Sequence, residues 1–394
     1  MKLNFNYFMP TRILFGAGKL NELANVRYLP GKKALIVISA DFTMKKYGYL
    51  DRVIGYLHDN GVQSTVFDKI LANPVAEHVT EGAALAKQEG CDFVIGLGGG
   101  SSIDSAKSIA VMTKNPGEYW DYVRGGSGKG KHLSEGILPI VAIPTTAGTG
   151  TEANPWTVIT KTETKEKIGW RADFTYPTLS IVDPELTTSV PPRLTAYQGM
   201  DTFFHAVEGY LATISNPASD MYALEAIRLV TEYLPIAVKD GSNIEARSAL
   251  AWASTQGGFV GSLSTTISHH SLEHAISAYH PDIPHGAGLT ATSMSYFTYL
   301  AERNGTRFPD IARTMGDDVD ALPEAEKPFA FVTALKKLIN NIGMEKANLA
   351  SFGVKKEEAP VIAQNSIDTM GGLYRYTPVK LEKQDVVNIL EACF

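Results

Sequence analysis

Residues 93–110, FVIGLGGGSSIDSAKSIA, contain the pattern that decides the fold. An apolar run ends at Leu97 and passes directly into Gly98, Gly99 and Gly100, after which apolar residues recur at helical spacing. This order predicts a strand, a tight turn and a helix. Glycines let a backbone approach a pyrophosphate, and the first turn of a helix offers unpaired N–H groups. The stretch therefore favours a nucleotide-binding loop over a simple tight turn without a ligand.

The loop departs from two standard phosphate-binding sequences. It misses the last glycine of the usual dinucleotide fingerprint, and no Gly-Lys-Ser/Thr follows as it would in a P-loop. A second polar loop, PTTAGTGTE at residues 144–152, follows another apolar run. Open α/β sheets bind ligands at the carboxyl ends of their strands, so both loops could line one crevice. The second loop would contribute Thr145, Thr146 and Thr149.

Strands and helices alternate through the first half of the chain. Apolar runs predict strands at residues 33–39, 65–67, 93–97, 137–143 and 179–186. Helical periodicity predicts helices at residues 47–60, 76–89 and 102–113. Such alternation implies a mostly parallel, Rossmann-like sheet.

The pattern of apolar residues along the chain changes at the Pro-rich passage DPELTTSVPPRLT, residues 183–195. Beyond it, runs of β-branched residues become less frequent. Proline-rich passages of this kind are typical of domain boundaries. Helical periodicity continues at residues 194–213, 219–238, 244–257, 327–342 and 383–392. We therefore predict an α/β dinucleotide-binding domain over residues 1–185 and an all-helical domain over residues 186–394.

Composition narrows the class of protein. The chain has 394 residues, 44% of them hydrophobic and 20% charged, as expected for a soluble two-domain protein. A net charge of −6 argues against nucleic acid as the main partner. The sequence contains no apolar stretch of membrane-spanning length and no secretory signal pattern. Two cysteines do not make a disulfide framework, so the cytoplasm is the expected location.

Histidines crowd into one short segment. Five of the nine lie between residues 269 and 285, in SHHSLEHAISAYHPDIPHG. Upstream, GMDTFFHAVE places Asp201 and His205 four residues apart, on one face of a helix. His270 and His274 repeat that spacing. A carboxylate with several imidazoles and no thiolate suits Fe(II) or Zn(II).

Each of these histidines also has a simpler interpretation. A single Asp-x-x-x-His pair is usually a surface or core pair rather than a ligand pair. A zinc metalloprotease is disfavoured because Ser271 stands where that motif requires Glu. His285 is expected on a Pro-His-Gly turn, and His269 on a different face of the helix from His270. Glu273 could orient a ligating histidine, although such a residue is more often solvated.

Taken together, these blocks resemble the iron-containing (group III) alcohol dehydrogenases over essentially the whole chain. The blocks are FGAGKL at residues 15–20, GLGGGSSIDSAK, IPTTAGTGTE, GMDTFFHAVE and the PHG segment. The resemblance implies a dehydroquinate synthase-like two-domain architecture with the active site between the domains. It also implies hydride transfer between NAD(P)(H) and a small or medium primary alcohol or aldehyde.

The same resemblance assigns roles to residues. The residues that match metal ligands are Asp201, His205, His270 and His285. His274 matches a histidine near the nicotinamide and the substrate, and it is the candidate catalytic residue for proton relay or substrate orientation. The candidate cofactor-binding residues are Ser39, Gly98, Gly99, Gly100, Ser101, Asp104, Thr145, Thr146, Thr149 and Lys167, the last of them near the ribose.

Two choices of cofactor follow. Many NAD-preferring members carry Asp at the position of Ser39, where an acid would repel a 2′-phosphate. Ser39 does not, and Lys45 and Lys46 lie downstream, so NADP(H) is preferred over NAD(H), with Asp41 counting against it. Four protein ligands would fill a tetrahedral zinc site, so Fe(II), which accepts more ligands, is preferred over Zn(II).

Three alternatives stay open. A dehydroquinate-synthase-like lyase would need a basic pocket, and the histidine segment has no Arg or Lys. A glycerol-type polyol dehydrogenase of the same superfamily would use a similar frame. A non-catalytic assembly protein is a third and weaker alternative. A homodimer is the expected oligomer. Trp156, Phe259 and Tyr279 could line the substrate pocket, although aromatic residues are more often core.

Overall fold

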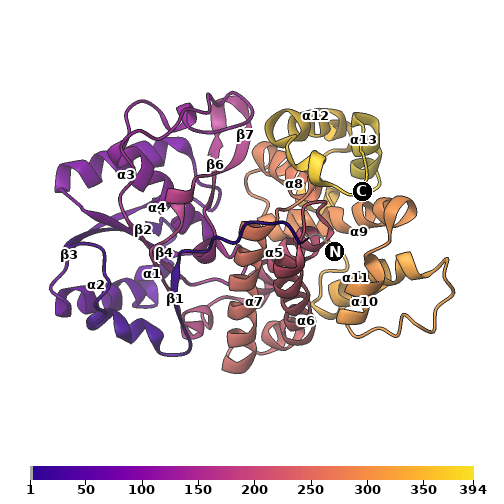
Figure 1. Cartoon of the computed structure of the whole chain (residues 1–394), viewed down its shortest axis with the longest axis horizontal. Helices are drawn as coiled ribbons and strands as arrows, with labels where there is room; N and C mark the ends of the chain where they lie inside the picture. The colour runs from indigo at the N-terminus through magenta and orange to yellow at the C-terminus, as the bar shows by residue number, and fades with distance from the viewer. Residues whose placement is uncertain (1–2) are drawn as a thin grey trace.

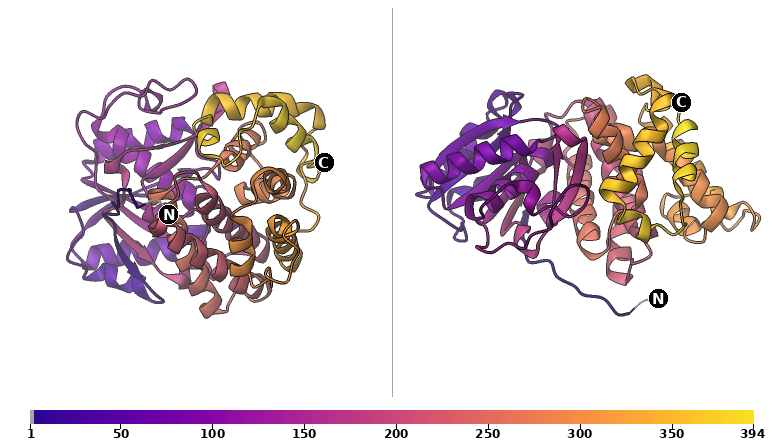
Figure 2. Two further views of the ribbon diagram at one scale, coloured as in Figure 1. Left: turned by 45° about the vertical axis from the view of Figure 1, so that its right-hand side comes forward. Right: turned by 90° about the horizontal axis from the view of Figure 1, so that it is seen from above.

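The computed structural model describes residues 3–394, and it consists of an α/β part and a helical part that lie side by side (Figure 1). Two further views show the same division (Figure 2). All of the strands in the described residues precede residue 183. They are β1 (Arg12–Phe15), β2 (Lys33–Ser39), β3 (Gln63–Ile70), β4 (Phe93–Gly98), β5 (Ile140–Pro144), β6 (Trp156–Lys161), β7 (Glu166–Arg171) and β8 (Leu179–Val182).

Six of these strands form one parallel sheet in the order β1-β8-β5-β4-β2-β3. Successive side chains of a strand point to opposite faces. In β2, Ala34 and Ile36 therefore enter the apolar layer on one face, while Leu35 and Val37 enter the layer on the other. A strand covered on both faces is apolar where it is buried, which is why residues 34–38 form a continuous apolar run.

Helices cover both faces of this sheet. α2 (Tyr49–Asp59) packs on one face, and α3 (Ala76–Glu89) and α4 (Gly100–Lys114) pack on the other. A short helix, α1 (Thr43–Lys46), follows β2. The Rossmann-like α/β fold predicted for the N-terminal half is therefore confirmed.

A two-stranded antiparallel hairpin, β6–β7, stands apart from the main sheet. The sequence analysis did not predict it. Its strands mix polar and apolar residues, so they lack the continuous apolar run by which the central strands were recognised. The hairpin matters because it carries one wall of the pocket described below.

The second half of the described chain contains helices and no strands. The helices are α5 (Pro192–Leu211), α6 (Pro217–Lys239), α7 (Ile244–Leu263), α8 (Ser268–Tyr279), α9 (His285–Asn304), α10 (Phe308–Thr314), α11 (Lys327–Asn341), α12 (Ala359–Met370) and α13 (Lys383–Glu391). Their inward faces share one apolar core. The predicted helical C-terminal part is therefore confirmed. Within residues 3–394, no helix is both long and apolar enough to cross a bilayer.

Two local predictions were wrong. The last strand ends at Val182 rather than residue 186, because Pro184 cannot donate to a strand ladder and instead begins a short 3₁₀ helix. His285 is not held on a turn but is the first residue of α9, with Pro284 as the N-cap. The Pro-His-Gly sequence marks the start of this helix.

The main chains of the two parts approach closely at Gly150 and Gly258. Gly150, in the loop after β5, has φ +59°, and a Cβ placed on it would lie 2.7 Å from Cα of Gly258 in α7. Real side chains do not approach so closely. We call this contact between Gly150 and Gly258 the glycine seam.

Candidate active site

The glycine turn joins β4 to α4 at the carboxyl edge of the sheet. Gly98 has φ +143°, a conformation that residues with side chains rarely adopt. Behind the turn, a Cβ at Gly96 would lie 2.7 Å from Cα of Ile103, so α4 packs directly on β4. The amino end of α4, with its positive dipole end and free amides, therefore faces this edge of the sheet.

The threonine loop after β5 lies against the glycine turn. The Thr145 amide donates to the carbonyl of Gly98 at 2.9 Å. A Cβ at Gly99 would meet Thr146 at 3.3 Å, and one at Gly100 would crowd Thr149. The carboxyl ends of two neighbouring strands thus bring the two predicted loops together. Ser101, at the start of α4, donates through its hydroxyl to the carbonyl of residue 72.

Ser39 lies at the carboxyl end of β2, on the same edge of the sheet. Its hydroxyl donates to Asp41 at 2.8 Å. Lys45, one of the two downstream lysines, is paired with Asp68 at 2.6 Å. The positive charge expected near the adenosine ribose is therefore partly engaged by a carboxylate.

Asp104 and Lys107 connect α4 to the segment that leads into the hairpin. Asp104 is buried, and its carboxylate accepts from the Thr151 hydroxyl and, at 2.9 Å, from the Val158 amide. Burial raises the pKa of this carboxyl. The Lys107 ammonium donates to the carbonyls of Thr151 and Trp156 at 2.8 and 2.7 Å. These bonds fix the position at which β6 begins.

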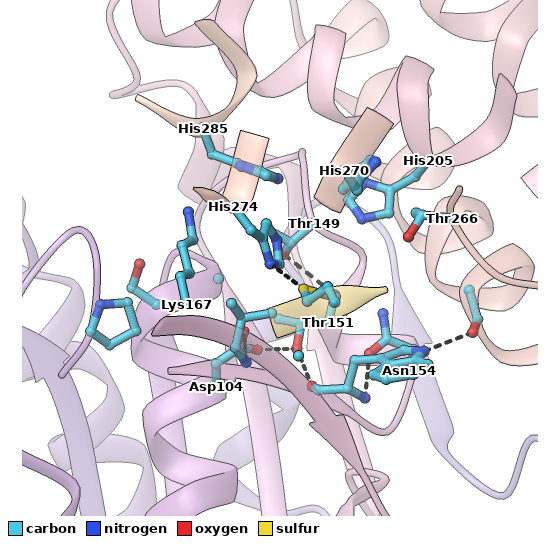
Figure 3. A pocket seen from close by; sticks show the side chains of 18 of the residues that line it. Asp104, Thr149, Thr151, Asn154, Lys167, His205, Thr266, His270, His274 and His285 are labelled. Carbon is cyan, nitrogen blue, oxygen red and sulfur yellow. Dashed lines mark hydrogen bonds between the residues drawn. The ribbon is translucent and has the colours of Figure 1, made fainter. Parts of the chain in front are cut away.

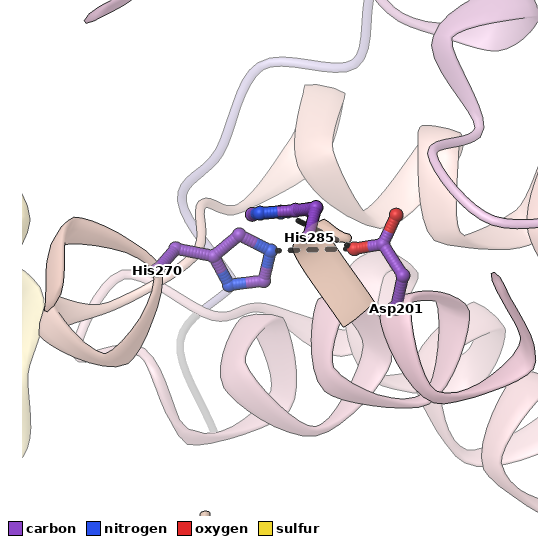
Figure 4. A group of neighbouring side chains, drawn as sticks. All are labelled: Asp201, His270 and His285. Carbon is purple, nitrogen blue, oxygen red and sulfur yellow. Dashed lines mark ion pairs between the residues drawn. The ribbon is translucent and has the colours of Figure 1, made fainter. Parts of the chain in front are cut away.

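Three of the four predicted metal ligands converge. Asp201 lies on α5, His270 on α8 and His285 at the start of α9. Oδ1 of Asp201 is 3.8 Å from Nε2 of His270 and 3.5 Å from Nε2 of His285 (Figure 4). Asp201 Oδ1 and His270 Nε2 are both buried and have no hydrogen-bond partner in the described residues. Buried polar atoms without partners are costly, so this geometry suits a cation between them.

His205 lies beside this group rather than within it. Its ring centroid is 4.4 Å from that of His270, and its Nδ1 is 3.1 Å from Oδ1 of Asp201. Burial disfavours the Asp201 carboxylate, but His205 and His285 outweigh burial and hold its pKa well below the ordinary value. A carboxylate ringed by imidazoles is thus the centre of the cluster.

Glu208 orients His270, and the sequence analysis missed it. Its carboxylate accepts from Nδ1 of His270 at 2.7 Å and from Nδ1 of His269 at 2.8 Å. Burial opposes the charge, but the two imidazoles lower the pKa of Glu208 to about 2. The signal was present, because Asp201, His205 and Glu208 are spaced i, i+4, i+7 on one helix face. His269 is a structural histidine, as expected.

Glu273 orients His285 in the way that Glu208 orients His270. It is fully buried, and its carboxylate contacts Nδ1 of His285 and lies 3.5 Å from the Lys167 ammonium. Burial favours the neutral acid, but His285 and Lys167 lower the pKa of Glu273. Lys167, on β7, therefore faces the histidine cluster from the hairpin (Figure 3). Its predicted position near the ribose stays a prediction.

His274 borders the cluster without joining the Asp201 group. Its ring centroid is 5.4 Å from that of His285, and its Nδ1 lies 2.8 Å from the sulfur of Met370. Burial, the Lys167 ammonium and His285 lower the pKa of His274, which favours a neutral imidazole. Met370 belongs to α12, 96 residues away, so sequence spacing could not associate it with this site.

One pocket joins the two halves of the site (Figure 3). The sheet part contributes Gly100, Ser101, Asp104 and Thr149, and the helical part contributes His205, His270, His274 and His285. Of the three aromatic candidates, Trp156 lines the pocket. Phe259 packs against Trp252 and Tyr222 instead, and the Tyr279 ring lies near the Lys165 ammonium.

Comparison with known families gives a consistent result over the whole chain. The model of the iron-containing alcohol dehydrogenases matches residues 10–184. The model of the C-terminal region of the same family matches residues 195–394. Two family models thus cover the α/β part and the helical part in turn.

Individual relatives agree with these models. The chain is 32% identical to an NAD-dependent methanol dehydrogenase of Bacillus methanolicus, covering 98% of this chain and 99% of that protein. It is 32% identical to a 1,3-propanediol dehydrogenase of Klebsiella pneumoniae, covering 99% of each.

Among solved structures, an archaeal alcohol dehydrogenase from a Red Sea brine pool superposes with a TM-score of 0.94 at 36% identity, covering 100% of both chains. A 1,3-propanediol oxidoreductase superposes with a TM-score of 0.91 at 32% identity, covering 99% of this chain and 100% of the other. The chain belongs to the iron-containing alcohol dehydrogenase family.

Proposed function

We propose that this protein transfers a hydride between a nicotinamide cofactor and a small or medium primary alcohol or aldehyde. The single observation that carries this proposal is the convergence of Asp201, His270 and His285 beside His274, in one pocket with the glycine turn. Hydride transfer needs the nicotinamide, the substrate carbon and a group that stabilises charge on the substrate oxygen to lie together. The pocket brings candidate residues for all three to one place.

We propose Fe(II) as the metal, with Zn(II) as the alternative. Asp201, His270 and His285 would hold it, with His205 beside them as the fourth ligand. The two buried atoms without partners, Asp201 Oδ1 and His270 Nε2, support this assignment. When bound, the ion supplies Lewis-acid stabilisation of negative charge on the substrate oxygen. Glu208 and Glu273, each at Nδ1 of a ligating histidine, fix the tautomer that presents Nε2 to the ion.

The chain's own residues account for the remaining steps. The glycine turn and the threonine loop would hold the cofactor phosphates through backbone amides. His274 is the proposed catalytic residue that orients the substrate hydroxyl and passes its proton. Its lowered pKa keeps the imidazole neutral, so that it can hydrogen-bond the substrate hydroxyl and orient it.

The lyase alternative is not favoured by the pocket. A phosphorylated acid would need several free cations. Among the described residues that line the pocket, the only Lys or Arg is Lys167, and Glu273 already pairs with it.

The test uses purified protein loaded with Fe(II). His270→Ala should lose bound metal and aldehyde reduction while keeping its affinity for the reduced nicotinamide, measured by fluorescence quenching. Metal analysis and turnover of butyraldehyde give the other two readouts. Full activity in a metal-free His270→Ala variant would overturn the proposal.

We propose NADP(H) rather than NAD(H) as the preferred cofactor. The support is the neutral Ser39 at the end of β2, which leaves a 2′-phosphate unopposed at that position. Asp41 and the pairing of Lys45 with Asp68 limit the preference. The Ser39→Asp variant should lower kcat/KM for NADPH far more than for NADH. Equal effects on both cofactors would count against the assignment.

We further propose that the protein is cytoplasmic and that its two domains meet at residues 185/186. We also propose that it forms a homodimer. The arm at residues 3–9 contains no helix or strand and extends outward from the α/β part, alongside the helical part (Figure 2). Its Phe5, Tyr7 and Phe8 side chains are 40%, 53% and 52% exposed. It leads into β1, which is an edge strand of the sheet. Exposed aromatic side chains beside a free sheet edge favour a second copy as partner. Light scattering on the purified protein tests this, and a monomer would refute it.

The cytoplasmic location is supported by the two cysteines, Cys91 and Cys393, which are free and buried. Free thiols are typical of reducing compartments. Cell fractionation with an antibody against the protein tests this assignment, and recovery outside the cytoplasm would refute it.

A further inference from the structure

One wall of the pocket is apolar, and it begins at the proposed catalytic histidine. We propose that this wall selects substrates in which a planar aromatic ring is attached directly to the reacting carbon, that is, aldehydes of the benzaldehyde type and the matching benzylic alcohols. This inference rests on the proposed function and names the substrate class for it. The overall change is aldehyde plus NAD(P)H plus a proton to alcohol plus NAD(P)⁺.

The wall is built around Trp156, whose indole is held in one orientation. Its Nε1 donates to the carbonyl of Gly261 at 2.8 Å. Its backbone amide donates to Asn154 at 2.9 Å, and its carbonyl accepts from Lys107 at 2.7 Å. An aromatic side chain fixed at both its backbone and its ring nitrogen offers a preformed flat surface, which loses little entropy on binding.

Two other apolar side chains meet this indole over a glycine. A Cβ placed on Gly169 would lie 3.6 Å from Cε of Met370 and 3.7 Å from both Cε3 of Trp156 and Cγ2 of Val158. All four residues line the pocket. Because residue 169 has no side chain, the three groups surround a shallow notch. A second glycine, Gly261, borders the other edge of the indole, with nothing nearer than 3.9 Å to its own Cβ position.

The notch lies close to the place of reaction. The sulfur of Met370 is 2.8 Å from Nδ1 of His274, so one residue belongs to the wall and also touches the proposed proton carrier. A substrate whose oxygen lies at the metal ligands would therefore place its first substituent against the wall. Thioether sulfur and indole both favour contact with an aromatic ring beyond simple apolar burial.

A charged substituent finds no free carboxylate, ammonium or guanidinium group here. Among the described pocket-lining residues, the Asp, Glu, Lys and Arg side chains are Asp104 and Lys167. Asp104 accepts from Thr151 and Val158, and Lys167 pairs with Glu273. A carboxylate or ammonium on the substrate would lose its hydration without compensation.

The experiment measures kcat/KM of the Fe(II)-loaded enzyme with three aldehydes: benzaldehyde, cyclohexanecarboxaldehyde and butyraldehyde. The first two have rings of similar size, but only the first is planar. The deciding quantity is how a variant changes the ratio of benzaldehyde to cyclohexanecarboxaldehyde, because intrinsic reactivity cancels in that change. Trp156→Leu should lower the ratio about tenfold, since one aromatic contact of this kind corresponds to roughly that factor.

Two further variants keep the test decisive. Trp252→Leu is the matched control: Trp252 packs against Phe15 and Phe259 outside the pocket, so the ratio should not change. Gly169→Ala adds a methyl group at ordinary contact distance from its neighbours, so it should fold. It fills the notch, and it should therefore lower kcat/KM for benzaldehyde several-fold more than it lowers kcat/KM for butyraldehyde.

The outcomes separate the two proposals. If no aldehyde is reduced, the proposed function fails. If butyraldehyde is reduced but neither Trp156→Leu nor Gly169→Ala changes the response to benzaldehyde, the substrate class proposed here is wrong while the proposed function stands. The proposed substrate class would also be wrong if Trp252→Leu lowered the ratio of benzaldehyde to cyclohexanecarboxaldehyde as much as Trp156→Leu does. The effect would then not be local to the wall.

Discussion

Replacing Glu208 by Gln should destabilise the helical part of the protein and weaken its hold on the metal. One carboxylate oxygen accepts from the Nδ1 atoms of His269 and His270, and the other accepts from the Ile267 amide at 2.8 Å. In the variant, one of these oxygens becomes an NH₂ group that faces hydrogen-bond donors. The perturbation therefore leaves buried donors without acceptors while hardly changing the volume of the side chain.

Two independent arguments give a similar loss of unfolding free energy for Glu208→Gln. The folded protein lowers the pKa of Glu208 from an ordinary 4.5 to about 2, and a difference of that size corresponds to about 3 kcal/mol of stability at neutral pH. Removing one member of a buried charge pair costs about 3–5 kcal/mol in other proteins. We therefore expect a loss of about 3 kcal/mol. Loss of a partner behind a metal ligand also lowers metal affinity about 10- to 100-fold.

The sign of the pH dependence gives a second check. A carboxyl whose pKa is lowered on folding stabilises the protein above its unfolded pKa, and this contribution disappears as pH falls through the folded value. The stability of the wild-type and Glu208→Gln proteins should therefore differ by the full amount at pH 7. The difference should shrink as the pH falls from 4.5 toward about 2.

The assay is urea unfolding of the metal-free proteins, followed by helical circular dichroism, with metal affinity measured by competition with a chelator. Glu225→Gln is the control, because Glu225 is an exposed partner of Arg228 on α6, and such surface pairs contribute at most about 1 kcal/mol. A loss below 1 kcal/mol in Glu208→Gln, or a metal affinity equal to that of the wild type, would refute the reasoning.

Three further variants test other parts of the structure. Gly286→Ala should lower both stability and bound metal severely, because a Cβ there would overlap the carbonyl of Tyr197 and displace the start of α9; thermal unfolding and metal analysis measure the two effects. Lys107→Met should cost about 3 kcal/mol or more, since it strips a buried ammonium from several acceptors, including two oxygens of Thr151; urea unfolding with the cofactor absent should show it. Asp183→Ala should cost about 1 kcal/mol, the usual value for removing a helix N-cap, although a loss above 3 kcal/mol would show that its bonds to the amino-terminal segment dominate.

The central sheet could be predicted well from the sequence because burial on both faces requires a continuous run of apolar residues. Residues 34–38 and 93–97 are apolar throughout, as expected of strands covered on both sides. The sequence signal for the β6–β7 hairpin is weaker. Its strand over residues 156–161 alternates in burial, with Thr157 and Ile159 inward, and an alternation that includes threonine does not stand out from loop sequence.

The site divides in the same way. Asp201, His205 and His270 could be recognised because helical spacing places such groups on one face. Glu208 shares that helix face with Asp201 and His205, but its contact with His270 forms only after the helices pack together. The same holds for the contact of Met370 with His274. His285 was recognised as a candidate ligand, but its position at the start of a helix was not predicted. Local periodicity therefore predicts elements and pairs, whereas contacts across elements need the fold.

The glycine seam has a consequence for how the enzyme can be rebuilt. Where two main chains touch without side chains between them, no rotamer can absorb a mismatch, and the spacing of the two lobes is set by the main chains themselves. A chimera that takes the nucleotide lobe from one relative and the metal lobe from another should therefore assemble only if both donors keep glycine at positions 150 and 258. A single methyl group at either position would act as a wedge and move the nicotinamide away from its reaction partner.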